Sequence, residues 1–130
     1  MGACYSVRLK VNVLDVPGAV KALNDHIVKD TSTNYSLEKY AAQGVTTETF
    51  DDLMRIFLAG WKGQEVDIYE ENGFAIYEND FDTSYGWEVV MMEMFQTLTP
   101  FVKNGSEFLI YIDNDYDKLV VRNGKYVQVH

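Results

Sequence analysis

The chain opens with an apolar pattern of period two. Every second residue from Tyr5 to Val13 is apolar, and the residues between them are polar. Because successive side chains of a β-strand point to opposite faces, this alternation predicts a strand over residues 5–13 with one buried face.

The period then changes to that of a helix. Asp15 is a residue type that caps helices and Pro17 suits a first turn, so a helix is predicted over residues 16–29. After a polar segment, residues 37–43 predict a short helix that ends at Gly44.

A third helix is predicted from the apolar stripe within residues 50–58. Thr46 or Thr47 is the expected N-terminal cap, and the glycines at positions 60 and 63 close the helix. Three helical segments therefore follow the first strand before strand-like sequence returns.

Two short strands, 66–70 and 74–78, flank an Asn-Gly pair, which is a strong hairpin signal. A two-residue loop pairs Ile68 with Tyr77, and a three-residue loop pairs Ile68 with Ile76. The three-residue loop is preferred because it places the apolar residues of both strands on one face. It requires a left-handed conformation at the glycine of the pair.

Residues 80–85 are polar and are interpreted as a loop, and Ser84 is the expected cap of a long helix. The buried stripe of this helix runs from Trp87 to Leu98, before Pro100 kinks it or begins a new turn. Methionines and Val89 widen its apolar face, so this helix is buried on two sides or contributes to a homodimer.

The next strand, residues 107–112, has little polarity on either face and is predicted to lie centrally, in the same sheet as residues 5–13. Residues 119–122 and 125–129 predict a final hairpin around Asn123-Gly124. The order β-α-(α)-β-β-α-β-β-β predicts an α+β fold, a ferredoxin-like split β-α-β sandwich with a C-terminal hairpin extending the sheet.

Length and composition favour one α/β domain over residues 1–130, since the chain is 47% hydrophobic and of ordinary domain size. A single cysteine excludes an internal disulfide and a multi-cysteine metal site. No apolar run approaches the ~18 residues of a membrane span. A reducing, cytoplasmic location without membrane association is therefore expected.

Charge separates the two halves of the chain. The formal net charge is −9, and residues 1–65 carry eight acids and seven bases, whereas residues 66–130 carry twelve acids and four bases. No Lys or Arg occurs between Lys62 and Lys103. The acids of this stretch and those at 113–117 are expected to form one continuous negative surface.

Such a surface repels nucleic acid and anionic membranes and attracts basic proteins. The sequence thus favours a non-enzymatic interaction module, one form of which is an inhibitor or nucleic-acid mimic, such as a mobile-element anti-defence protein acting on a nucleic-acid-binding enzyme. Increased solubility is the simpler explanation of the same charge. The residues expected to contact the partner are Glu70, Glu71, Glu78, Asp80, Asp82, Asp113, Asp115 and Asp117.

The alternative is a small-ligand or divalent-metal-binding domain that uses the sheet face and the Asp-rich turns at 80–86 and 113–117. Both turns lack the Gly and Glu positions of an EF-hand loop. The two histidines, His26 near the end of the first helix and His130, are too few for a catalytic triad or a His-rich metal site. No cofactor and no catalytic residue are predicted.

Overall fold

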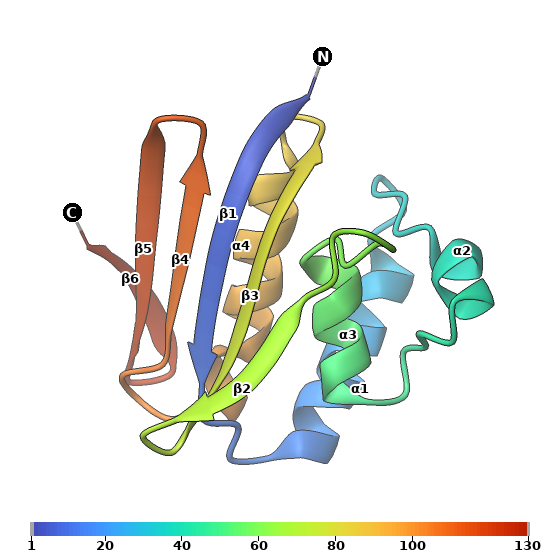
Figure 1. Ribbon diagram of the computed structural model, residues 1–130. Helices are drawn as coiled ribbons and strands as arrows, with labels where there is room; N and C mark the ends of the chain where they lie inside the picture. Colours follow the sequence, from blue (N-terminus) through green and yellow to red (C-terminus); the bar gives the residue numbers. More distant parts are fainter. Residues whose placement is uncertain (1, 130) are drawn as a thin grey trace.

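The computed structural model describes residues 2–129, which form one six-stranded antiparallel sheet with helices on one face (Figure 1). The elements in chain order are β1 (Ala3–Val11), α1 (Val16–Lys29), α2 (Leu37–Ala42), α3 (Phe50–Phe57), β2 (Asp67–Glu71), β3 (Phe74–Thr83), α4 (Trp87–Leu98), the 3-10 turn η1 (Thr99–Phe101), β4 (Glu107–Ile112), β5 (Asp115–Arg122) and β6 (Lys125–Val129). The strand order is β2-β3-β1-β4-β5-β6. The predicted α+β class is confirmed.

Strand β1 lies inside the sheet, and its two faces differ as the alternation predicts. Its residues from Tyr5 to Val11 at odd positions are buried against the helices, and it pairs with β3 on one side and β4 on the other. Strand β4 pairs with β1 and with β5, so it is internal, as predicted from its apolar character. Figure 1 shows α1, α3 and α4 on one side of the sheet, whose opposite face is open.

The first helix begins and ends as predicted, with the Asp15 carboxylate accepting a hydrogen bond from the Gly18 N–H at 3.0 Å. Helix α3 differs at its start, because Thr49 rather than Thr46 or Thr47 caps it. The Thr49 hydroxyl accepts from the Asp52 N–H at 3.2 Å, which satisfies one of the free amides of the first turn.

The predicted loop at residues 80–85 is wrong over its first four residues. Residues 80–83 continue β3 alongside the start of β1, and Phe81 stacks on Tyr5 with ring centroids 5.1 Å apart. The prediction of Ser84 as a cap is also wrong. Helix α4 starts after Gly86, which has a φ of 106° and donates its N–H to the Glu88 carboxylate at 3.0 Å.

The β2–β3 hairpin has a two-residue turn, so the preferred three-residue loop is wrong. Ile68 lies opposite Tyr77, and both central turn residues have positive φ, 53° at Asn72 and 82° at Gly73. These angles are those of a type I′ turn. The register follows from β3, because Tyr77 faces the helices and Ile76 faces the open side, where Lys10 and Tyr69 flank it in the pairing.

Replacing Gly73 by valine is expected to lower the free energy of unfolding by about 1–2 kcal/mol, since a β-branched side chain resists the left-handed conformation. The matched change Asn72→Gly is expected to cost nothing measurable, because glycine adopts positive φ readily. Urea unfolding of the two variants measures both effects. An unchanged midpoint for Gly73→Val would contradict the turn assignment.

The last three strands form two tight hairpins. Strand β5 begins at Asp115, earlier than predicted, and Asp113 and Asn114 form the turn that joins it to β4. Asp115 and Asp117 therefore lie in a strand and do not share a turn with Asp113. The hairpin at Asn123-Gly124 is confirmed, with φ angles of 55° and 75°.

Candidate functional site

A groove of about 580 Å³ crosses the open face of the sheet. The loop residues Gly63, Gln64 and Glu65 bound it on one side, and Leu109 and Tyr111 of β4 bound it on the other. A second hollow of about 440 Å³ continues it toward the turn between β4 and β5. The two hollows have four lining residues in common, which are Ser6, Gln64, Asp80 and Tyr111. They form one surface, called the sheet groove below.

The groove exists because β1 contributes small side chains to the open face at this end. Cys4 and Ser6 form its floor, while the neighbouring strands place longer side chains beside them. The register aligns Ser6 with Asp80 on β3 and with Tyr111 on β4. Short side chains on β1, between longer side chains on β3 and β4, produce the hollow.

Four carboxylates of this region have no ion-pair partner. Within residues 2–129, no Lys, Arg or His nitrogen lies within 4.0 Å of any of them, and they are Asp67, Asp80, Asp82 and Asp113, to which Glu65 in the bordering loop adds a fifth. Asp80 accepts a hydrogen bond from the Ser6 hydroxyl at 2.6 Å. These groups present negative charge to solvent at one end of the open face.

Hydrogen bonds fix the ionisation of groups at the end of the groove. The Tyr85 hydroxyl donates to Asp113 at 2.6 Å, and the Cys4 N–H donates to the same carboxylate at 3.2 Å. Both bonds hold the pKa of Asp113 below its usual value. The hydrogen bond to Asp82 and the charge of that carboxylate raise the pKa of the Cys4 thiol. At neutral pH the Asp113 carboxylate is therefore ionised.

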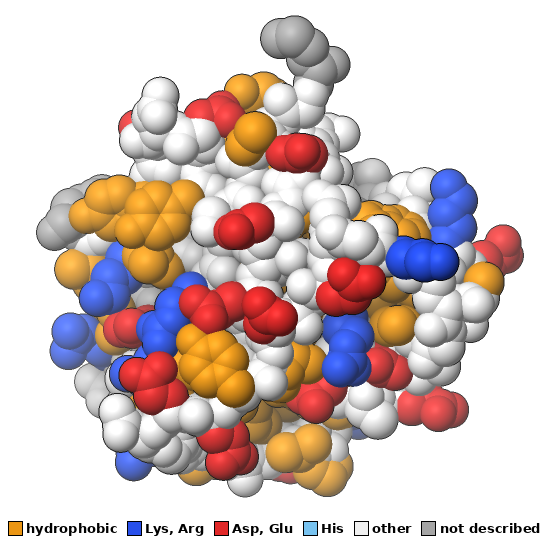
Figure 2. All heavy atoms as spheres, in the orientation of Figure 1, with side chains coloured by type: hydrophobic (Ala, Val, Ile, Leu, Met, Phe, Trp, Pro, Cys, Tyr) orange, Lys and Arg blue, Asp and Glu red, His pale blue; other side chains and the backbone are white. Residues whose placement is uncertain are grey.

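The rest of the open face is closer to neutral. Arg8 pairs with Glu71 at 3.1 Å and with Glu78 at 3.6 Å, and Lys118 pairs with Glu107 at 3.7 Å. Figure 2 looks onto this face and shows acidic side chains across its middle, with a group of Lys and Arg side chains over β4–β6. The unpaired acids therefore belong to the groove end and not to the whole face.

The predicted contact residues divide between the two faces of the sheet. Glu71, Glu78, Asp80 and Asp82 lie on the open face, and Asp113 lies at its end. The other three, Glu70, Asp115 and Asp117, pair with Ala75, Ile112 and Ile110 and therefore point to the helix side. The expected continuous negative surface is wrong, because alternate residues of a strand face opposite ways.

Several groove residues were not among the predicted contacts, and Asp67, Gln64 and Tyr111 are three of them. The position of Asp67 could have been predicted from the sequence with a two-residue turn, because that turn aligns Asp67 with Glu78. Gln64 reaches the groove from a loop, and its amide oxygen accepts from the Asp82 N–H at 3.1 Å. No pattern in the sequence indicates that contact.

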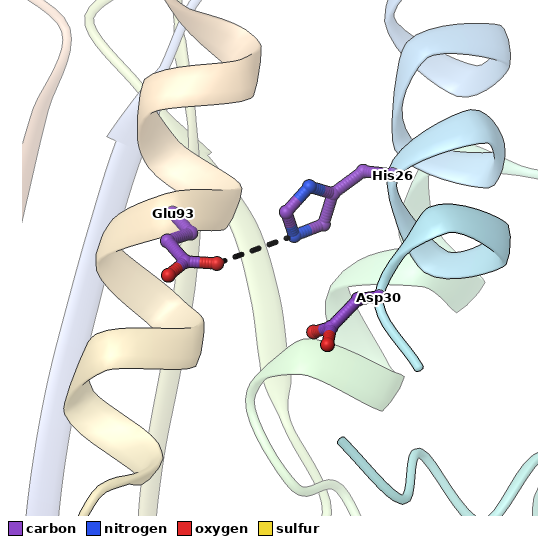
Figure 3. A group of neighbouring side chains, drawn as sticks. All are labelled: His26, Asp30 and Glu93. Atoms are coloured by element: carbon purple, nitrogen blue, oxygen red, sulfur yellow. Dashed lines mark ion pairs between the residues drawn. The ribbon is translucent and has the colours of Figure 1, made fainter. Parts of the chain in front are cut away.

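A separate group of side chains has the spacing to hold a metal ion. It comprises His26, Asp30 and Glu93 in the helical layer, with one potential ligand atom from each lying within 4.8 Å of the others (Figure 3). Across residues 2–129, no comparable group occurs at the Asp-rich segments of the sheet. His130 lies outside the described residues.

Comparisons with protein-family models, with curated proteins and with solved structures gave no match. Within the described part of the chain, no helix is both long enough and apolar enough to cross a membrane.

Proposed function

We propose that the protein is a non-enzymatic interaction module that binds a basic segment of a protein partner in the sheet groove. One observation carries the proposal: the groove combines unpaired carboxylates with the exposed ring of Tyr111, above a floor of small side chains. A Lys or Arg side chain is long enough to reach this floor, and its positive charge would pair with carboxylates that have no cationic partner within residues 2–129.

The groove chemistry favours a guanidinium or ammonium group over other ligands. Asp80 and Asp82 are exposed, so a bound cation gains their attraction without requiring them to leave a salt bridge. Tyrosine is common at interaction hot spots, and its ring face attracts cations. Opposite charge also accelerates the encounter of two proteins and makes it sensitive to salt.

The strand order supports a finer description of the fold, which we include in the proposal. The order β2-β3-β1-β4 supports a ferredoxin-like split β-α-β plan, and the β5–β6 hairpin beyond β4 supports an extension of that sheet. RNA-binding proteins of this plan use the open sheet face with basic residues for the phosphates. Here the corresponding end is acidic, which favours a basic protein, including a nucleic-acid-binding enzyme that the module inhibits. The exposed free thiol of Cys4 is in keeping with a reducing, cytoplasmic setting.

The test compares two triple variants that remove the same formal charge from opposite faces. The groove variant is Asp67→Asn, Asp80→Asn and Asp82→Asn. The control is Glu70→Gln, Asp115→Asn and Asp117→Asn, whose side chains face the helix side. The probe is a short arginine-rich peptide, and binding is followed by fluorescence anisotropy at two salt concentrations.

The wild-type protein is expected to bind the peptide, and its affinity is expected to fall steeply as salt passes 0.1 M, where the screening length is about 10 Å. The groove variant should bind about tenfold more weakly, a change of about 1.4 kcal/mol, with unchanged unfolding because exposed carboxylates contribute little to stability. The control should bind as the wild type does. Equal losses in both variants, or no binding by the wild type, would leave net charge and solubility as the explanation.

A further inference from the structure

The last turn of α1 meets α4 at a polar cluster within an otherwise apolar contact (Figure 3). His26 and Asp30 come from this turn and its C-terminal cap, and Glu93 comes from the middle of α4. Figure 3 shows the imidazole of His26 directed toward the Glu93 carboxylate, with the Asp30 carboxylate nearby. Two helices therefore hold three potential metal ligands toward one point.

The ring nitrogen of His26 is the unusual atom of this cluster. The His26 side chain is 21% exposed, but its Nε2 is buried and has no hydrogen-bond partner. The Glu93 carboxylate lies 3.9 Å away, which is longer than a hydrogen bond. The ring of Phe57 lies near the imidazole, with centroids 6.4 Å apart. A buried polar atom without a partner is costly, and a bound ion would satisfy it.

The Asp30 carboxylate is fixed and ionised before any ligand binds. It accepts hydrogen bonds from the hydroxyls of Thr33 at 2.6 Å and Tyr35 at 2.7 Å, and from the backbone and hydroxyl of Ser32. The Thr33 and Tyr35 hydroxyls hold the pKa of Asp30 well below its usual range. Metal-ligating carboxylates are commonly held by such outer hydrogen bonds. Ser32 is exposed, so its hydroxyl can turn to water if the ion takes its place.

We propose that His26, Asp30 and Glu93 bind one divalent transition-metal ion, Zn²⁺ in first place. One imidazole nitrogen with two carboxylates is a borderline donor set, which suits Zn²⁺ better than Ca²⁺ or Mg²⁺, both of which prefer oxygen ligands alone. Three protein ligands leave the fourth tetrahedral position to water. The inference does not rest on the proposed function, because the cluster lies in the helical layer and the groove lies on the open face.

The geometry requires only a small closure. Zinc bonds to nitrogen and oxygen of about 2.0–2.2 Å place tetrahedral ligand atoms roughly 3.4 Å apart. The three atoms now lie within 4.8 Å of one another. The Glu93 side chain is 53% exposed, so it can move toward His26 without disturbing the core.

The experiment uses the full chain after dialysis against a chelator, with zinc chloride titrated in a calorimeter. Cobalt(II) replaces zinc in a parallel absorption measurement, since tetrahedral cobalt has strong visible bands. One ion per chain is expected, with a higher unfolding temperature in its presence because the ion binds the folded state. The variants His26→Gln and Glu93→Gln are each expected to weaken binding by at least about tenfold.

Asp25→Asn is the matched control. Asp25 is an exposed carboxylate next to His26, and it pairs with Lys21 at 2.9 Å instead of facing the cluster. Its replacement should leave zinc affinity unchanged, as should the groove triple variant. Absence of binding to the wild type, or equal binding by His26→Gln, would overturn the proposal and leave a histidine–glutamate ion pair. Glu93→Gln keeps the test decisive if the His26 variant unfolds, because Glu93 is half-exposed.

Discussion

Replacing Phe95 by alanine is expected to lower the free energy of unfolding by about 3–5 kcal/mol, the usual cost of removing a buried phenylalanine. Phe95 is fully buried on the inner face of α4. Its ring lies 5.6 Å from that of Phe108 in β4 and 6.0 Å from that of Tyr126 in β6. One side chain thus joins the helix to an internal strand and to the final hairpin.

Urea unfolding followed by circular dichroism measures this loss. The control is Val89→Ala on the same helix, where the side chain is 52% exposed and the change should stay within about 0.5 kcal/mol. If the two variants unfolded at the same urea concentration, α4 would not be packed on the sheet as described.

The second large effect is expected at a polar residue in the core. Asn79→Leu should cost about 1–3 kcal/mol, because it leaves a buried carbonyl without its donor. The Asn79 amide nitrogen lies 2.8 Å from the carbonyl oxygen of Leu58 and 3.4 Å from that of Ala59, so it ties β3 to the end of α3. The apolar replacement of similar size preserves volume, which isolates the lost hydrogen bond.

Comparing the thermal unfolding of Asn79→Leu with that of Asn114→Ala tests whether the loss comes from the buried hydrogen bonds of Asn79 and not from replacing any asparagine. Asn114 is exposed in the turn between β4 and β5, so its change should have little effect. A melting temperature for Asn79→Leu equal to or above that of the wild type would show that the Asn79 hydrogen bonds contribute nothing net to stability.

Elements with one clearly buried face could be predicted from the sequence. The strict alternation after Tyr5 defined β1, and Asp15 marked the start of α1. The apolar run at 107–112 indicated an internal strand because little polarity on either face is typical of strands inside a sheet, and β4 has this position. In each case a repeating pattern over many residues outweighed local ambiguity.

Predictions failed where a single residue carried the signal. Residues 80–83 resemble a polar loop because aspartates flank Phe81, yet that one aromatic ring packs on Tyr5 and keeps the segment in the sheet. The hairpin register failed because Ile76, although fully buried, lies on the open face and not in the main core. The prediction assumed that all apolar residues of the hairpin share one face. On the open face, however, side chains of the neighbouring strands cover Ile76 and keep it from solvent.

The charge map predicted that acids would be unpaired, but not which would be neighbours. Glu70 and Glu71 are adjacent in sequence, but successive residues of a strand point to opposite faces of the sheet, so their side chains are separated. The sequence could indicate only part of the helical cluster. His26 and Asp30 are one helical turn apart, whereas Glu93 belongs to another helix. Contacts between distant elements require the topology, which local spacing does not supply.

The central position of β1 also has a consequence for how the chain folds during synthesis. Tyr5 pairs with Phe81 and with Ile112, so both partners of the first strand are made long after it. A ribosome adding about 5–20 residues per second needs roughly 5–20 s to reach the second partner. Until then at least one edge of β1 is unpaired and open to aggregation, and we expect Arg8 and Lys10 on its open face to act as charged gatekeepers.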